Sequence, residues 1–289
     1  MERKGKTFNL TQPGLINCIL EATGMEDCRP NAVPAAPKPL GTDPEGEPMQ
    51  EKWNYWSVVG MLLYLSTNTR PDIALAVSQV ARFSSNPKQS HATAVKTLVR
   101  YLKGSKHVGT IFTPTEELNI EYYVDADYAG LNNVEDQDDP ISAKSRTGYI
   151  TRFAGCPSFW KSKLQDSTAV STGHAKYIAL SLALHQVLPF YQLIREALAI
   201  LQPTLSMNVP RVVVYEDNAA ALTLAQTHRL TPRTRFYNTV LHHWWEFVES
   251  GEIVVEFIKI ETGHQLADYL TKPLPRKSFV IAHMGNQGI

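Results

Sequence analysis

The chain has 289 residues, of which 43% are hydrophobic and 19% are charged. This balance is typical of a globular protein and excludes a chain that is disordered throughout. Lysine plus arginine and aspartate plus glutamate number 28 each, so the formal net charge is zero. Net charge therefore gives no support for nucleic-acid binding, although a local basic patch would not show in the total.

The cysteines and the apolar runs indicate the compartment. Cys18, Cys28 and Cys156 form an odd set without metal-ligand spacing, which favours reduced thiols. The first ten residues, MERKGKTFNL, carry charge and no apolar run follows them, so we predict no signal peptide. No stretch approaches the roughly 18 apolar residues that are needed to cross a membrane. We therefore expect an intracellular, cytoplasmic protein without membrane contact.

Helical patterns dominate the chain up to about residue 110. The first helix is expected from Pro13, near its first position, to Gly24, which stops it. A segment rich in Pro and Gly, residues 28–48, predicts an extended linker. Further helical patterns cover residues 54–67, 71–85 and 90–104. The first of these three is expected to be a central packing helix because it contains Val58, Val59, Leu62, Leu63 and Leu65.

The helix predicted over residues 90–104 carries a basic stripe. Lys96, Arg100, Lys103 and Lys106 lie near one another at helical spacing. A solvated helix face accounts for such a stripe, and a helix that contacts phosphates is the alternative. Lys96, Arg100 and Lys103 are therefore candidate nucleic-acid contacts.

From about residue 118 the pattern changes to that of an α/β fold. Residues 118–130, 147–155 and 157–163 read as three strands of a meander. A long helix to about residue 200 follows, and then a continuous apolar strand over 211–218. Two helical segments, a last strand over 251–260 and a short helix over 264–272 complete the order. A meander joined to crossover-connected strands predicts a mixed sheet flanked by helices.

Carboxylates follow two of these strands. Asp125 and Asp127 end the first strand on one face, Asp217 ends the apolar strand, and Asp268 lies in the last short helix. If the strands are neighbours, Asp125, Asp217 and Asp268 converge, and such clusters are usually held by divalent cations. Two such ions can activate water and stabilise the leaving oxygen in phosphodiester cleavage. The alternative is that these are strand-end and N-cap aspartates that accept bonds from backbone amides.

Several blocks of the sequence together resemble one family. They are NYWSVVGMLLYLSTNTRPDIALAVSQVARFSSNP, HATAVKTLVRYLKG, YVDADYAG, SRTGYI, STGHAKYIALS, EDNAAAL and LADYLTKPL. In this order they are similar to the C-terminal part of copia-type LTR-retrotransposon polyproteins, and the similarity covers nearly the whole chain. The catalytic Tyr-Val-Asp-Asp box of the polymerase palm is missing, so the resemblance implies a fragment or a degenerate copy.

The resemblance implies a ribonuclease H-like α/β domain after a mostly helical reverse-transcriptase segment. The expected parts are 1–48, the tail of the palm and a linker; 49–117, thumb or connection helices; 118–275, the ribonuclease H-like domain; and 276–289, a C-terminal tail. It also implies a nucleic-acid partner, an RNA–DNA hybrid or template, and the palm region of an intact element. A virus-like particle or the nucleus is a further location that such an element uses.

The family cleaves the RNA strand of RNA–DNA hybrids with four carboxylates and two Mg²⁺ ions, with Mn²⁺ as an alternative metal. Asp125, Asp217 and Asp268 match three of these catalytic and metal-binding residues. The fourth is a glutamate in a Ser-Thr-x-Glu-Ala-Glu-Tyr pattern, and here that segment reads STGHAKY, with Lys176 at the catalytic position.

The change at Lys176 predicts impaired hydrolysis. An ammonium supplies neither the negative charge nor the oxygen ligands that hard cations need. One contact between charges a few ångströms apart is worth roughly 4 kcal/mol at an effective dielectric constant of about 20. Lys176 could instead lie among Asp125, Asp217 and Asp268 and pair with them in place of a metal, which would keep the fold and remove the catalyst. The alternatives are a non-catalytic hybrid-binding module and a decayed element.

Three further positions have weaker roles by the same resemblance. His174, at the other glutamate position, is a candidate ligand that would suit zinc or manganese better than magnesium, and an exposed helix-start histidine is the alternative. Arg233 and Arg235 are candidate phosphate contacts. Phe236 and Asn238 stand in that segment where the family usually has a histidine and an aspartate.

Overall fold

The computed structural model describes residues 2–132, 134–135, 139–201, 210–226 and 244–287. Its centre is a five-stranded mixed sheet with the order β6-β5-β4-β7-β8. The strands are β4 (Ile120–Asp127), β5 (Arg146–Phe153), β6 (Cys156–Leu164), β7 (Val212–Glu216) and β8 (Val255–Lys259). The first three form the predicted antiparallel meander, and β7 and β8 join it in parallel. These observations confirm the predicted α/β fold class, a mixed sheet flanked by helices.

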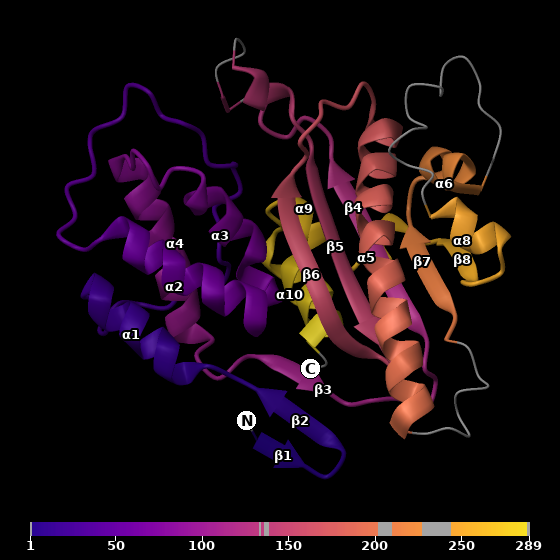
Figure 1. The fold of residues 1–289 in the computed structure, drawn as a ribbon. Helices are drawn as coiled ribbons and strands as arrows, with labels where there is room; N and C mark the ends of the chain where they lie inside the picture. The colour runs from indigo at the N-terminus through magenta and orange to yellow at the C-terminus, as the bar shows by residue number, and fades with distance from the viewer. Residues whose placement is uncertain (1, 133, 136–138, 202–209, 227–243, 288–289) are drawn as a thin grey trace.

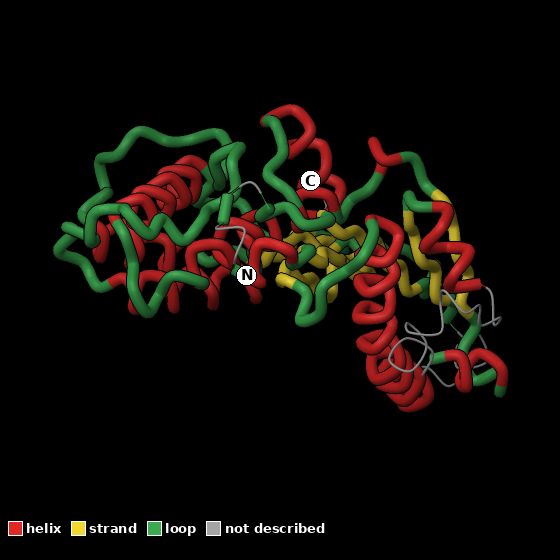
Figure 2. Tube along the Cα trace, turned by 90° about the horizontal axis from the view of Figure 1, so that it is seen from above, coloured by secondary structure: helices red, strands yellow, loops and turns green. Residues whose placement is uncertain are grey.

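One face of the sheet is covered by the long helix α5 (Thr172–Leu201). Alternate residues of β4, namely Ile120, Tyr122 and Val124, are fully buried and form one core with that helix. Trp244 belongs to the same core. Figure 1 shows α5 crossing in front of the sheet, and Figure 2 shows it on the side opposite the C-terminal helix. The sheet therefore separates two cores.

The apolar character of α5 exceeds what we expected from the sequence. Helix α5 is long and apolar enough to cross a membrane, judged by length and composition only. No other helix in the described part of the chain meets both conditions. The expectation that no stretch approaches this limit was wrong. The helix packs along the sheet, and 44% of its most apolar 18-residue segment is buried there. The core helix of a globular domain packs in the same way.

The other core lies between the sheet and a bundle of helices. The bundle contains α1 (Pro13–Thr23), α2 (Tyr55–Asn68), the 3₁₀ turn Pro71–Ile73, α3 (Ala74–Ala81) and α4 (Gln89–Gly104). It meets α9 (Asp268–Thr271) and α10 (Arg276–Gln287) behind the sheet. Trp160 on β6 donates a hydrogen bond from Nε1 to the carbonyl oxygen of Ser66 on α2, at 2.7 Å. The helical part is thus bonded directly to the sheet.

The structure differs from the sequence predictions at both ends of this helical part. Three short strands, β1 (Glu2–Lys4), β2 (Thr7–Leu10) and β3 (Thr110–Phe112), form a separate antiparallel sheet, so the segment is less purely helical than predicted. Residues 276–289, expected as a tail, contain α10, and Phe279 of this helix packs edge-on against Tyr101. The remaining short helices are α6 (Ala219–Gln226) and α8 (Trp245–Glu249), with 3₁₀ turns at Pro140–Ala143 and Thr262–His264.

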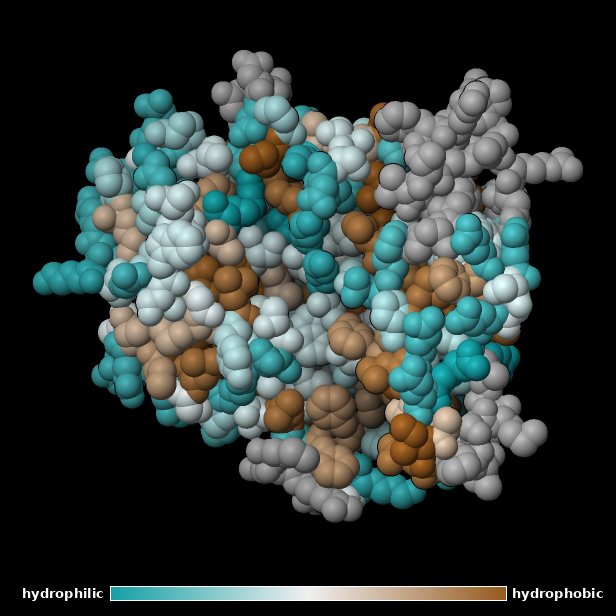
Figure 3. Space-filling view, in the orientation of Figure 1, coloured by the Kyte–Doolittle hydropathy of each residue, from teal (hydrophilic) through white to brown (hydrophobic). Residues whose placement is uncertain are grey.

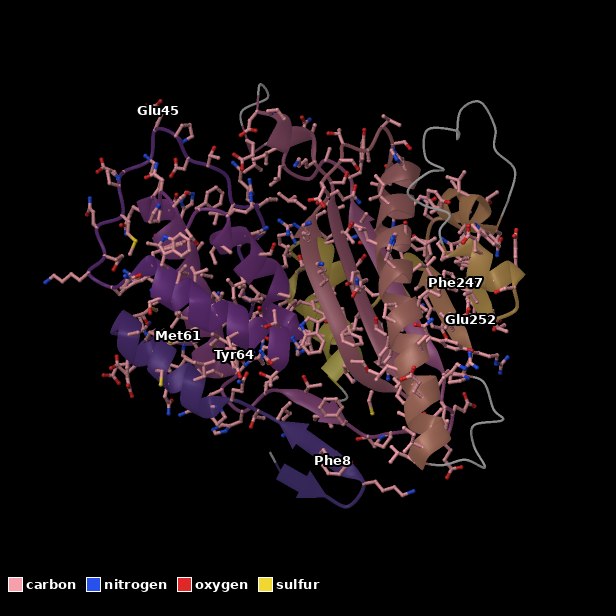
Figure 4. All side chains as sticks on the ribbon, viewed as in Figure 1. Phe8, Glu45, Met61, Tyr64, Phe247 and Glu252 are labelled. Atoms are coloured by element: carbon pink, nitrogen blue, oxygen red, sulfur yellow. The ribbon has the colours of Figure 1, made fainter. Side chains whose placement is uncertain are left out.

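Helix α2 is buried on one side only. The core side of α2 is buried as predicted and consists of Val58, Val59, Leu62 and Leu65. The predicted end of α1 is also confirmed, because Gly24 adopts the left-handed conformation there. Leu63, also expected in the core, is 42% exposed, and Tyr64, labelled in Figure 4, is 57% exposed. The apolar run was too continuous to show which side of the helix meets solvent.

A buried ion pair fixes the ends of three helices. The Arg70 guanidinium donates two hydrogen bonds to the Asp72 carboxylate, at 2.8 and 2.9 Å, and both side chains are fully buried. Arg70 also donates to the backbone and hydroxyl oxygens of Ser105, after α4. Tyr101 donates its hydroxyl to Asp72 at 2.5 Å. Because every charge in this network is paired, its loss leaves a buried charge uncompensated.

We expect Asp72→Ala to lower the free energy of unfolding by about 3–5 kcal/mol, because Arg70 stays buried without a counter-ion. Tyr101→Phe removes one hydrogen bond and keeps the ion pair, so its expected cost is about 1–2 kcal/mol. Urea denaturation of both variants measures the difference. Equal losses would contradict the role of Asp72 as the counter-ion of Arg70.

Candidate functional site

Asp125 lies at the carboxyl end of the central strand β4, where the sheet is covered by α9. Its side chain is buried, and the Thr271 hydroxyl donates to Oδ2 at 2.6 Å. Gly148 pairs with Asp125 across the β4–β5 ladder. A Cβ at Gly148 would lie 2.6 Å from Thr271 Cγ2 and 2.8 Å from Leu270 Cβ. Glycine at this position therefore allows α9 to approach and supply Thr271.

Lys176 connects the two aspartates that end β4 and β7. It lies in the first turn of α5, and its Nζ donates to Asp125 Oδ1 at 2.5 Å and to Asp217 Oδ1. Glu216 Oε1 lies 3.4 Å from the same nitrogen. The lysine, Asp125 and Glu216 are all buried. An ammonium thus occupies the point on which the carboxylates converge.

Charge pairing controls the ionisation of this cluster. Burial raises the pKa of Asp125, but the charge of Lys176 and its hydrogen bond outweigh burial and hold that pKa below the ordinary value. Burial opposes ionisation of Asp217 too, and hydrogen bonds from Glu216 and Lys176 nevertheless lower its pKa. Burial lowers the pKa of Lys176, and the neighbouring carboxylates raise it by more. Asp125, Asp217 and Lys176 are therefore all charged at neutral pH.

Glu216 is a site residue that we did not predict from the sequence. It is fully buried, and its Oε1 accepts the backbone N–H of Asn218 at 3.0 Å. Burial raises the pKa of Glu216 to about 8, against the attraction of Lys176. The signal was present in the alternation of β7, because Val212, Val214 and Glu216 share one face and both valines are fully buried.

Asp268 lies beside Asp125. Burial and the negative charge of Asp125 raise the pKa of Asp268 to about 6. Lys272 donates to Asp268 Oδ1 at 3.0 Å, one turn along. Asp127 is half-buried nearby, and burial followed by the charge of Asp125 raises its pKa. The structure therefore brings Asp125, Asp217 and Asp268 to one corner of the sheet, with a lysine between the first two.

This corner does not fit a divalent metal ion. In the described residues there is no group of three His, Cys, Asp or Glu side chains that could hold one. The Nζ of Lys176 takes the lone pairs of Asp125 and Asp217 that would face a shared cation, and its positive charge repels one. The expected Mg²⁺ or Mn²⁺ site is therefore not formed by this arrangement of side chains.

Comparison with known proteins shows what this chain is similar to. The chain is 34% identical over 285 residues to the retrovirus-related Pol polyprotein from transposon TNT 1-94 of Nicotiana tabacum. It is 31% identical over 273 residues to that from transposon RE1 of Arabidopsis thaliana. These alignments cover 96% and 94% of this chain. Along nearly its whole length, the chain is therefore similar to a segment of copia-type Pol polyproteins.

The chain spans only a fifth or less of these Pol polyproteins, 20% of the first and 17% of the second. No family model matches it. Among solved structures, it resembles LC11-RNase H1, crystallised in complex with an RNA/DNA hybrid, with 16% sequence identity and a TM-score of 0.35. That likeness covers 53% of this chain and 94% of the other.

The structure describes four of the other residues singled out in the sequence, namely His174, Lys96, Arg100 and Lys103. His174 is 7% exposed, and its Nδ1 accepts the backbone N–H of Val170 at 3.1 Å, so the exposed alternative was wrong. On α4, Lys96 pairs with Glu51 and Lys103 donates to the carbonyl oxygen of Glu26, while Arg100 is exposed. The positions Arg233, Arg235, Phe236 and Asn238 lie outside the described residues.

The raised pKa of Glu216 predicts that the free energy of unfolding of this chain depends on pH. Between about 4.5, its ordinary value, and about 8, the native state keeps a proton that the unfolded state releases. Stability contributed by this group is therefore lost as the pH rises through that window. Glu216→Gln removes the titration, so the free energy of unfolding of the natural chain should fall relative to the variant between pH 5 and 9, by on the order of a few kcal/mol.

Denaturant titrations of both proteins at pH 5, 7 and 9 measure this difference. Glu261→Gln is the matched control, because the Glu261 side chain is 88% exposed and the exchange should be nearly neutral at every pH. A constant difference between the natural chain and Glu216→Gln across the range would mean that Glu216 ionises normally in the folded state.

Proposed function

We propose that this chain is the ribonuclease H-like region of a copia-type Pol polyprotein that binds RNA–DNA hybrids and does not cleave them. One observation carries the proposal: the Lys176 ammonium is bonded to both Asp125 and Asp217. The family relation supports the hybrid as the partner, and the palm region of an intact element as a second partner in the cell.

The physical argument rests on charge. The lysine compensates the two aspartates and so preserves the fold, because converging buried carboxylates without a cation would repel each other. It also excludes the metal, since a second cation a few ångströms from Nζ meets roughly 4 kcal/mol of repulsion per unit charge at an effective dielectric constant of about 20. A scaffold with its carboxylates already paired retains the surface that holds a nucleic acid and lacks the metal ions that would activate water.

The deciding experiment incubates the purified chain with a labelled RNA–DNA hybrid in Mg²⁺ and, separately, in Mn²⁺. We expect binding of the hybrid and no release of RNA fragments above background. Asp217→Asn is the control that separates this activity from a contaminating nuclease. Cleavage by the natural chain that Asp217→Asn abolishes would overturn the proposal, in either metal.

Lys176→Glu tests the cause of the loss. This exchange places another carboxylate among Asp125, Glu216 and Asp217, so the variant should be less stable than the natural chain in EDTA. Mg²⁺ should then raise its thermal midpoint, while the natural chain and Lys176→Gln should show no such increase. A Mg²⁺-dependent midpoint in the natural chain would show that Lys176 does not exclude the ion.

A further inference from the structure

A groove of about 790 Å³ runs between the helical part and the end of the sheet. One wall comes from α3 and the segment that follows it, including Ser78, Arg82 and Lys88. The other wall comes from the ends of the β4–β5 connection and of β6, including Lys144 and Lys163. Figure 3 shows hydrophilic side chains along the upper part of this boundary. No residue of the candidate metal cluster lines the groove.

The groove is lined mainly by positive charge. Its charged lining residues are Arg82, Lys88, Lys144, Lys163 and one acid, Asp166. Arg82 is paired with Glu135 at 2.5 Å, and Lys163 with Asp166 at 2.9 Å on an exposed part of the surface. Lys88 and Lys144 form no ion pair with any residue that the structure describes. At least two cations on facing walls are therefore available to an anion.

A buried arginine behind the groove adds a further positive charge, which the charge of Asp127 compensates only in part. Arg146 is 5% exposed, and it donates from Nη1 to the Ser78 hydroxyl at 2.8 Å, which itself lines the groove. Its Nη2 is buried without a hydrogen-bond partner among the described atoms. Asp127 stands opposite it in the β4–β5 ladder, and no ion pair joins the two. Such a guanidinium is costly alone, and an anion in the groove offsets its charge.

A buried glutamine connects the groove lining to the elements that form the carboxylate corner. Gln165 lines it, and its Nε2 donates to the carbonyl oxygen of Ala175 at 2.8 Å and to the Thr147 hydroxyl at 3.0 Å. Ala175 directly precedes Lys176, and Thr147 precedes the residue that pairs with Asp125. The groove lining and the corner are thus joined through one buried, hydrogen-bonded side chain.

We propose that this groove binds the sugar–phosphate backbone of one nucleic-acid strand. The inference rests on the proposed hybrid binding and names the surface that performs it. Phosphate oxygens accept bonds from lysine and serine side chains. Both walls present lysines, and the α3 wall also presents Ser78 and Ser85. Apolar lining residues such as Phe83 and Leu164 lie between these donors and can contact sugars and bases. An acidic peptide does not carry the regularly repeated phosphates of a nucleic-acid backbone.

The test measures the affinity of the full chain for a labelled RNA–DNA hybrid by fluorescence anisotropy at several salt concentrations. Lys88→Gln/Lys144→Gln removes the two available cations. The matched control, Lys161→Gln/Lys277→Gln, removes the same charge from exposed positions outside the groove lining. The groove variant should bind about tenfold more weakly at low salt, and its slope of log affinity against log salt should decrease by about two. The control should stay within about twofold of the natural chain.

Equal losses in the two double variants would overturn the proposal, because the effect would then be one of net charge. Polyglutamate that competes at the affinity of the hybrid, and loses it in the groove variant, would overturn it in favour of an acidic peptide. Matched circular dichroism spectra and thermal midpoints exclude unfolding as the cause. Metal-dependent cleavage that Asp217→Asn abolishes would contradict only the absence of hydrolysis, so the two failures are distinguishable.

Discussion

The contact of Lys176 with Asp125 and Asp217 is the interaction on which the rest of this corner depends. It joins the N-terminal part of α5 to the ends of two central strands, at a place where the buried Asp125 and Glu216 meet the half-buried Asp217. Without a positive charge these groups would repel each other and stay partly protonated. One ammonium satisfies the electrostatic requirement of the fold and, by the same position, removes the requirement for a metal ion.

The surrounding structure holds this contact in place from the other side of the sheet. Gly148 lets α9 approach closely, and α9 supplies the Thr271 hydroxyl to the second oxygen of Asp125. Helix α10 follows and packs against the helical part, whose buried Arg70–Asp72 pair fixes the helix ends there. The helical part therefore belongs to the same folded unit as the sheet, and the basic groove exists because the two meet.

Several elements were readable from the sequence because they depend on local pattern. The alternation in Ile120–Asp127, the apolar run in Val212–Glu216 and the Gly24 stop each specify a conformation through neighbouring residues alone. Strands β1, β2 and β3 were missed since each has only three or four residues, and β3 pairs with a segment about a hundred residues away. Pairing at such distances leaves no periodic signal in either partner.

The sequence by itself determined the fold class, the family resemblance and the replacement of a carboxylate by Lys176. These follow from residue type and order, which the chain carries without folding. The sequence also suggested that Lys176 pairs with the aspartates. Only the tertiary structure decided which partners meet at its nitrogen, namely Asp125, Asp217 and the unexpected Glu216, while Asp268 is bonded to Lys272. The inward position of Glu216, the free Nη2 of Arg146 and the groove between two parts of the chain likewise arise from packing. The burial of a side chain and the charges around it depend on residues from several elements that meet only in the folded chain. The sequence pattern predicts them only where a single helix or strand determines them.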